Sequence, residues 1–261
     1  MISLIQIEEI SRKLKTNTTV IAREYVQLVF LQNFYDLPGS EKIFFKGGTA
    51  IRFLMEGFRF SEDLDFTCET SLSVVKDLVA EAVKKIQNII VGLEIKEKKS
   101  LAGKTYLMTI GKGLVPFPVF VRLDFSFREK VLQKEKHIIK TDFPITFTSF
   151  THHLGSQEIL AEKTRAIMSR NAGRDLFDFW FLLQQGQKIN KDYIKLKMSY
   201  YPKISFSWEN LLEKVRKYNF DKFKKDLLPF ISVDKRAKID EMFAIIQNQL
   251  EEKIESFADL R

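Results

Sequence analysis

The sequence predicts an α+β fold, in which helical regions flank a core of mixed strands and helices. Residues 1–38 carry apolar side chains at helical spacing and end at Pro38-Gly39, a pair that stops a helix. From about residue 40 to 150, short apolar runs typical of strands mix with helical patterns, and from about 155 onward the pattern is helical again. We therefore expect an N-terminal helical segment at 1–38, a core at 39–150 and a helical C-terminal domain at 151–261.

Individual elements can be placed in chain order. Thr18 and Thr19 precede an apolar helix face that includes Tyr25, Val29 and Phe34. The middle region should hold a short helix at 49–55, a long amphipathic helix at 72–90, and strands at 42–45, 63–67, 93–97, 105–110 and 119–127. Prolines at 202 and 229 should interrupt the last helical part.

The composition is that of a globular protein. The chain has 261 residues, of which 45% are hydrophobic and 29% charged, and these values exclude global disorder. A single cysteine, Cys68, excludes an internal disulfide framework, and one cysteine with three histidines argues against a zinc cluster. The N-terminus reaches acidic residues too early for a secretory signal, and no apolar run approaches the roughly 18 residues of a membrane helix. We expect a soluble, cytoplasmic protein.

Positive charge is concentrated in one region. The chain carries a net charge of +8, and residues 184–238 contain 14 Lys and Arg against 6 Asp and Glu. Aromatic residues such as Trp208, Tyr218 and Phe220 are interleaved with these cations. Such a mixture suits phosphates and unstacked bases, which points to a nucleic-acid partner. The alternative is a set of amphipathic helices whose solvated faces are rich in lysine.

A pair of glycines stands between an apolar strand and a helix. Lys46 is followed by Gly47, Gly48 and Thr49. Glycines there let backbone N–H groups approach a ligand closely, and a helix N-terminus favours an anion. The spacing is not that of a Walker A loop, and such a turn can also be no more than a tight turn.

Three aspartates occur in apolar surroundings. Strand alternation places Ser61, Asp63 and Asp65 on one face, where the two carboxylates repel each other unless a divalent cation offsets the repulsion. Asp124 lies in a second apolar run and shares a face with Arg122. Pairing with Arg122 would explain this acid, but as a third carboxylate on an adjacent strand it would complete a two-metal site for phosphoryl transfer.

Two later helices carry charged residues on apolar faces. Lys163 lies within the apolar stripe of 157–167 and either extends outward to solvent or reaches a buried anion. Asp175 can be explained as a carboxylate at a helix N-terminus, whereas Asp178 lies in a helix that is apolar nearly all round.

Three of these motifs resemble those of the AbiEii/AbiGii toxin family. KGGTAIRFLMEGFRFSEDLDF is similar to the opening motif of that family, and EILAEKTRAI and RDLFDF are similar to its later helical motifs, in the same order. The resemblance covers about residues 40–183. It implies the nucleotidyltransferase fold of the DNA polymerase beta-like superfamily, with a small mixed sheet, helices and a helical C-terminal part.

The resemblance also implies roles for single residues. Lys46, Gly47, Gly48 and Thr49 would hold a nucleoside triphosphate, with Ser61 beside it and Lys163 steadying its phosphates. Asp63, Asp65 and Asp124 would bind two Mg²⁺ ions. Asp178 would help to activate the acceptor, as a general base.

The family implies an enzyme that transfers a nucleoside monophosphate from a nucleoside triphosphate. The main hypothesis is a Mg²⁺-dependent toxin of a toxin–antitoxin or phage-defence (abortive infection) system that modifies RNA, with tRNA as the acceptor at the basic region 184–238. A cognate antitoxin is a second expected partner. Two alternatives are open, namely nucleotidylation of a protein target, and a binding module that has kept the fold without the chemistry.

Overall fold

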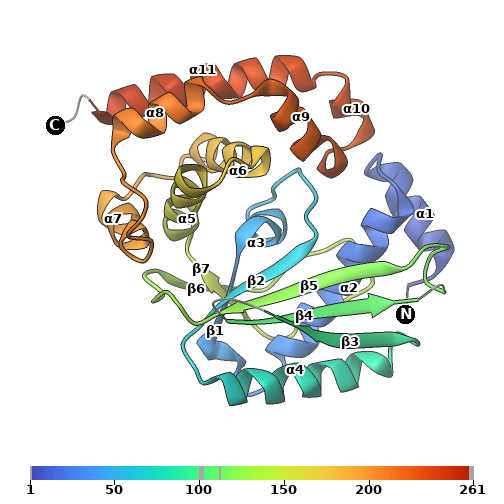
Figure 1. Cartoon of the computed structure of the whole chain (residues 1–261). Coiled ribbons are helices and arrows are strands. Elements are labelled where there is room, and N and C mark those ends of the chain that lie inside the picture. The colour runs from blue at the N-terminus through green and yellow to red at the C-terminus, as the bar shows by residue number, and fades with distance from the viewer. Residues whose placement is uncertain (1, 100–102, 112, 259–261) are drawn as a thin grey trace. The chain divides into compact units, whose positions relative to one another are not determined.

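The structure of the protein is a computed structural model that describes residues 2–99, 103–111 and 113–258. The few residues outside these ranges include positions within each of the three expected parts. The chain divides into two compact units, residues 1–154 and residues 155–261. Figure 1 shows their elements.

The first unit is built on a seven-stranded mixed sheet. The strand order is β3-β4-β5-β2-β1-β7-β6. The strands are β1 (Ile43–Lys46), β2 (Asp63–Cys68), β3 (Leu93–Lys98), β4 (Gly103–Ile110), β5 (Val119–Ser126), β6 (Lys134–His137) and β7 (Thr151–Leu154). The helices are α1 (Leu4–Lys13), α2 (Thr18–Tyr35), α3 (Gly47–Leu54) and α4 (Leu72–Gln87), and a 3₁₀ helix spans Ser40–Lys42.

Helix α2 packs on one face of the sheet through aromatic side chains. The Phe34 ring contacts the rings of Phe66 on β2 and Phe125 on β5, and the last two are stacked with centroids 4.7 Å apart. The alternating pattern of each strand puts these rings on the buried face and the intervening polar residues on the opposite face. The aromatic core therefore determines which way the acidic residues of β2 and β5 point.

The second unit is helical. Its helices are α5 (Ser156–Ser169), α6 (Gly173–Gln184), α7 (Lys191–Ser199), α8 (Trp208–Arg216), α9 (Phe220–Leu227), α10 (Val233–Arg236) and α11 (Ile239–Ala258), with a 3₁₀ helix at Leu228–Phe230. Helices α8 and α11 lie side by side, and α5 packs against α6 and α7 (Figure 1). None of the described helices is long and apolar enough to span a membrane.

The predicted fold class is confirmed, and most predicted elements occur within a few residues of their expected positions. Two strands were not expected. β6 has the sequence KEKH, which carries no alternating apolar signal, and β7 has only four residues. β7 lies between β1 and β6 in the sheet, and the first unit therefore extends to Leu154, three residues beyond the start of the expected C-terminal domain at 151.

Candidate active site

The three aspartates lie on two neighbouring parallel strands. Asp63 and Asp65 are on β2, and Asp124 is on β5 directly opposite Asp65 in the strand register. All three side chains are half-buried on the same face of the sheet, while the apolar residues between them are buried on the other. The fold thus brings together the three acids that the sequence pointed to.

Arg122 lies between two of these acids. Its Nη2 is 3.0 Å from Asp63 Oδ2 and 2.9 Å from Asp124 Oδ2, and its side chain is 50% exposed. The pairing of Arg122 with Asp124 that the sequence left open therefore occurs, and Asp63 shares the same guanidinium. The hydroxyl of Thr105 on β4 donates a hydrogen bond to Asp124 Oδ1. Sequence reasoning missed Thr105, because nothing in the sequence indicates the register that places it opposite Asp124.

The glycine turn closes directly over this acidic face. α3 begins at Gly47, whose φ of +78° is a left-handed conformation that favours glycine. A Cβ at this position would overlap the carboxylate of Asp65, and a Cβ at Gly48 would overlap the guanidinium of Arg59 and come within 3.1 Å of Ser61 Oγ. The turn is therefore more than a change of chain direction, since its backbone fits closely against an acid, a hydroxyl and an arginine.

Thr49 ties the turn to the acidic strand. Its hydroxyl donates a hydrogen bond to the backbone carbonyl of Asp63, and the residue is buried. The hydroxyl is therefore used within the fold, which leaves the backbone at this helix start as the part suited to an anion. Lys46 precedes the turn and lies opposite Asp65 in the register of β1 and β2.

The segment before β2 is held by buried polar contacts. Arg59 is buried, and its Nη1 donates to the carbonyl of Phe60 at 2.9 Å. Gln27 on α2 donates to the carbonyl of Ser61 at 3.2 Å. These contacts fix Ser61 next to Gly48. Sequence reasoning missed Arg59, which only its place beside the acidic motif could have indicated.

The donor chemistry of this face fits a hard divalent cation. Three carboxylates on adjacent strands offer the oxygen ligands that Mg²⁺ prefers, and they already hold one cationic group. They are not drawn into a compact cluster in this structure. Among the described residues, only Glu135, His137 and His153 form a group of three whose ligand atoms all lie within 4.8 Å of one another.

Lys163 and Asp178 are paired with each other in the second unit. Lys163 Nζ on α5 is 2.7 Å from Asp178 Oδ2 and 3.0 Å from Asp175 Oδ1 on α6. The Lys163 side chain is only 10% exposed, so it reaches inward to buried carboxylates rather than outward to solvent. Burial alone would raise the pKa of Asp175, but the charges of Lys163 and Arg170 together lower it below its usual range.

A second buried ion cluster fixes the same helix. Lys197 on α7 is fully buried, with its Nζ 2.7 Å from Glu158 Oε1 and 3.1 Å from Glu162 Oε1 on α5. The polar residues of the EILAEKTRAI motif therefore hold neighbouring helices in place. Sequence reasoning missed Lys197, although its place on the apolar stripe of Ile194 and Met198 was a usable signal.

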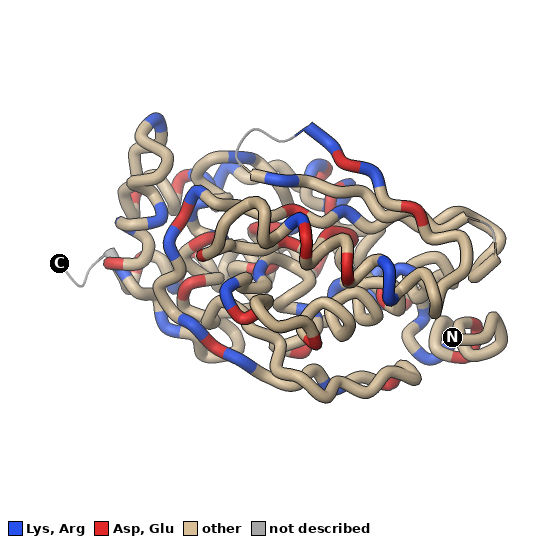
Figure 2. Tube along the Cα trace, turned by 90° about the horizontal axis from the view of Figure 1, so that it is seen from below, with Lys and Arg blue, Asp and Glu red and all other residues tan. Residues whose placement is uncertain are grey.

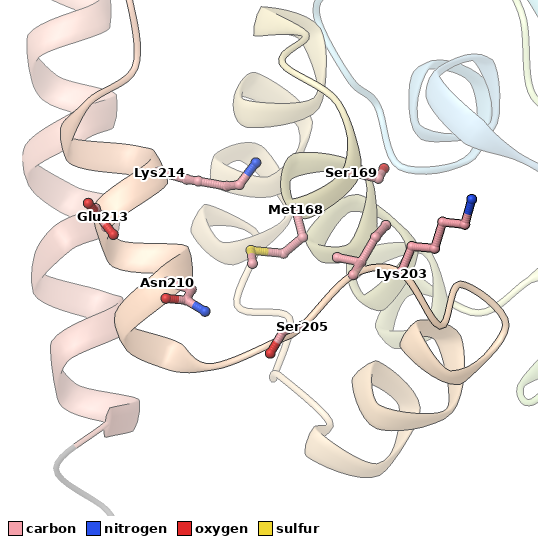
Figure 3. A pocket seen from close by; sticks show the side chains of 8 residues that line it. Met168, Ser169, Lys203, Ser205, Asn210, Glu213 and Lys214 are labelled. Carbon is pink, nitrogen blue, oxygen red and sulfur yellow. The ribbon is translucent and has the colours of Figure 1, made fainter.

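The basic region contains a pocket and an adjoining hollow along α5 and α8. The pocket has a volume of about 340 Å³, and Lys203 and Lys214 lie on either side of Met168 at its wall (Figure 3). The neighbouring hollow shares Lys214 and adds Lys217 and Tyr218. Along the Cα trace, basic and acidic residues are interspersed (Figure 2). Part of the predicted basic and aromatic set is core material, because Lys197, Tyr218 and Phe223 are buried.

Comparison with known proteins gives two kinds of match. The sequence model of the family described as nucleotidyl transferase AbiEii toxin, Type IV TA system, matches residues 29–254. Among solved structures, MenT4, a nucleotidyltransferase toxin from Mycobacterium tuberculosis H37Rv, is 15% identical and superimposes with a TM-score of 0.64, covering 99% of this chain and 94% of that one. JHP933 from Helicobacter pylori is 21% identical with a TM-score of 0.52, covering 94% and 98%. No curated protein sequence matches the chain.

Proposed function

The chain belongs to the AbiEii family of nucleotidyltransferase toxins, and from that premise we propose that it transfers a nucleoside monophosphate from a nucleoside triphosphate to RNA, with tRNA as the acceptor, in a Mg²⁺-dependent reaction. The observation that carries the proposal is the close fit of the Gly47-Gly48 turn against the carboxylate face of β2 and β5. Membership of a toxin–antitoxin family also implies a cognate antitoxin.

The turn and the acids have complementary tasks. The backbone N–H groups at the start of α3 would bind the triphosphate, and Ser61 lies beside Gly48 to add a hydroxyl. Asp63, Asp65 and Asp124 would hold Mg²⁺, which when bound neutralises charge on the α-phosphate and on the pyrophosphate. The carboxylates themselves carry the negative charge that keeps such an ion beside the triphosphate.

The reaction exchanges one phosphorus–oxygen bond for another. An acceptor hydroxyl oxygen forms a bond to the α-phosphorus, the bond from that phosphorus to the bridging oxygen breaks, and pyrophosphate leaves. The proton of the hydroxyl passes to a base. We assign this base to Asp124, which would both hold the metal ion and accept this proton, rather than to Asp178, because Asp124 is 30% exposed whereas Asp178 is buried against Lys163.

The role proposed for Lys163 stays as predicted, whereas the one proposed for Asp178 differs. Asp175 and Asp178 hold the Lys163 ammonium charged and in a defined place. We propose that Asp178 is a positioning residue for Lys163, and that Lys163 adds positive potential for the phosphates.

The pocket along α5 and α8 supports RNA as the acceptor. Lys203, Lys214 and Lys217 are exposed cations that line it or its neighbour, together with one acid, Glu213, which is paired with Lys217. Ser169, Ser205 and Asn210 add hydrogen-bonding groups. Cations with polar neighbours on a concave surface suit a phosphate backbone.

The transfer reaction can be tested by incubating the protein and total cellular RNA with each α-³²P-labelled nucleoside triphosphate and Mg²⁺. A labelled band of tRNA size that disappears in Asp63→Asn is the expected result. Asp77→Asn, which removes an exposed carboxylate of α4, is the matched control and should keep full labelling. Label on protein alone would favour the protein-target alternative. No label, together with no metal-dependent nucleotide binding, would sink the enzymatic proposal.

The RNA surface can be tested separately by the salt dependence of tRNA binding. The plot of log K against log salt has a negative slope. Replacing Lys203, Lys214 and Lys217 with Gln should make this slope less steep by roughly 0.7–0.9 for each phosphate that the protein no longer neutralises. The same three-charge change at exposed lysines of α4 (Lys76, Lys84 and Lys85) controls for net charge. An equal reduction of the slope in both variants would contradict a specific RNA surface at the pocket.

A further inference from the structure

Two of the three histidines in the chain meet across the edge of the sheet. β6 pairs with β7 so that Glu135 lies opposite His153 and His137 lies opposite Thr151. Residues opposite each other, and residues two apart, share a face of an antiparallel pair. His137 Nδ1 is 2.7 Å from His153 Nε2, and both lie within 4.8 Å of a carboxylate oxygen of Glu135.

His153 is in the protonation state that a metal ligand needs. Its Nδ1 lies 2.8 Å from the carbonyl oxygen of Leu154, which can only accept a hydrogen bond, so Nδ1 carries the proton and Nε2 presents a lone pair. The residue is 1% exposed. A histidine that donates its other N–H to a backbone carbonyl is the usual arrangement of a metal-bound imidazole.

The neighbouring groups are oriented in a similar way. Gln133 Nε2 donates to Glu135 Oε1 at 2.9 Å and fixes that carboxylate. His137 is exposed, so its Nε2 can carry the proton when Nδ1 is needed as a ligand. Thr151 lies opposite His137 on the same face, and its buried Oγ1 has no hydrogen-bond partner among the described residues. A polar group of this kind suits a water molecule bound beside it.

We propose that Glu135, His137 and His153 bind a borderline divalent transition-metal ion of the Zn²⁺ class, with water as a further ligand that can hydrogen-bond to Thr151. Two imidazoles and one carboxylate with one open position form a ligand set that Zn²⁺ accepts and that Mg²⁺, which prefers oxygen ligands, does not. Tetrahedral coordination at about 2.0–2.1 Å needs the two nitrogens about 3.3 Å apart. The exposed His137 therefore has to move by about half an ångström from its hydrogen-bonded position.

The ion would stabilise the edge of the sheet. β6 is a terminal strand of four residues whose one neighbour among the described strands is β7, and the segment at 138–150 connects the two. A short edge strand with one partner is weakly held, and an ion that joins β6 to β7 would resist its separation. The numbers of cysteines and histidines argue against a zinc cluster, but such numbers contain no information on the strand pairing that brings two histidines together in the sheet.

The proposal can be tested on the tag-free, metal-stripped full-length chain by titration with Zn²⁺ against a chromophoric chelator. One equivalent is expected to bind with a dissociation constant below about 10 µM. His137→Ala removes an exposed ligand and should weaken binding at least about 100-fold, because loss of an outer partner alone costs 10–100-fold. His152→Asn, on the same strand but the opposite face, should bind as the unchanged protein does.

A second measurement needs no variant. The three histidines give three imidazole spin systems in ¹⁵N-correlated NMR spectra, and Zn²⁺ should shift two of them and leave His152 in place. Excess Mg²⁺ should not displace Zn²⁺, and Asp63→Asn should not change the stoichiometry, which keeps this test independent of the proposed catalytic site. Unchanged affinity in His137→Ala, displacement by Mg²⁺, or no saturable binding would each overturn the proposal.

Discussion

Replacement of Lys163 by Met should destabilise the helical unit by about 3–5 kcal/mol, the range measured when one partner is removed from a buried ion pair. The structure shows that this ion pair is buried, and loss of one partner from a buried pair lowers the free energy of unfolding most. Lys163 is 10% exposed, and the side chains of Asp175 and Asp178 are almost completely buried. Met fills a similar volume, so the loss comes from carboxylates left without this ammonium rather than from a cavity.

Arg170 provides the contrast that tests the reasoning. Its Nε lies 2.7 Å from Asp175 Oδ2, closer than Lys163 is to the same carboxylate, but its side chain is 65% exposed. Only the arginine end of this pair is solvated, since the Asp175 side chain is 2% exposed. Arg170→Gln should therefore cost less than the about 3–5 kcal/mol expected for Lys163→Met, in which the ammonium is buried as well. If burial rather than distance sets the energy of an ion pair, the contact of Lys163 with Asp175 at 3.0 Å stabilises the protein more than the contact of Arg170 with Asp175 at 2.7 Å.

Urea unfolding followed by tryptophan fluorescence measures this directly. Both tryptophans of the chain, Trp180 and Trp208, lie in the helical unit. The comparison should also depend on pH. The lowered pKa of Asp175 contributes stability that is present above its unfolded pKa of about 3.9 and is lost as pH falls through the folded pKa. The difference in the free energy of unfolding between the unchanged protein and Lys163→Met should therefore be largest above about pH 5. It should begin to decrease as the pH falls below about 4.

A loss below about 1 kcal/mol at neutral pH in Lys163→Met would refute this reasoning. So would equal losses in Lys163→Met and Arg170→Gln. The small loss would mean that Lys163 behaves as a solvated cation, and a weakened nucleotide affinity of the variant could then be attributed to direct contact with phosphates. Equal losses would mean that burial of the cation does not set the energy of these ion pairs. If Lys163→Met loses stability as expected, its nucleotide affinity has to be measured under conditions in which the variant is confirmed to be folded.

Three further outcomes are expected in the first unit. Gly47→Ala should abolish nucleotide transfer and should destabilise the protein more than Gly92→Ala does. Both glycines have a similar positive φ, but only at Gly47 would a Cβ overlap the Asp65 carboxylate. Urea titrations and labelling assays of the two variants check this. Arg122→Gln should lower the Mg²⁺ or Mn²⁺ concentration needed for half-maximal binding, because the guanidinium competes with the ion for two carboxylates, and a higher requirement would contradict it. Cys68, the single thiol, is buried and its pKa is raised to about 12 by burial, so a disulfide reagent at pH 8 should react with it only after unfolding.

The parts of the fold that the sequence predicted best are those with a local apolar pattern. The acids of β2 and β5 were identified because each stands out against buried Leu and Phe neighbours. The helix that carries Lys163 was identified for the same reason. These signals depend only on nearby residues, so a single sequence contains them.

The parts that the sequence did not predict depend on register and long-range contact. Thr105 meets Asp124 only through the pairing of β4 with β5, and His137 meets His153 only through β6 and β7, neither of which has an apolar pattern of its own. Likewise, the reach of Lys197 to Glu158 requires the packing of α7 on α5. Pairings of this kind are set by tertiary packing, which no local pattern specifies.

The two groups of ion pairs differ in a way that bears on how the enzyme can work. Arg122 is half-exposed, so it can leave Asp63 and Asp124 for about 1 kcal/mol or less when a divalent ion and a triphosphate take its place. Lys163 would have to leave a buried Asp178, at a cost of about 3–5 kcal/mol. We infer that the pair on the sheet exchanges partners in each cycle and that the pair between α5 and α6 persists. A general base must give up its ion pair before it can accept a proton, and by this argument Asp124 can do so at a lower cost than Asp178.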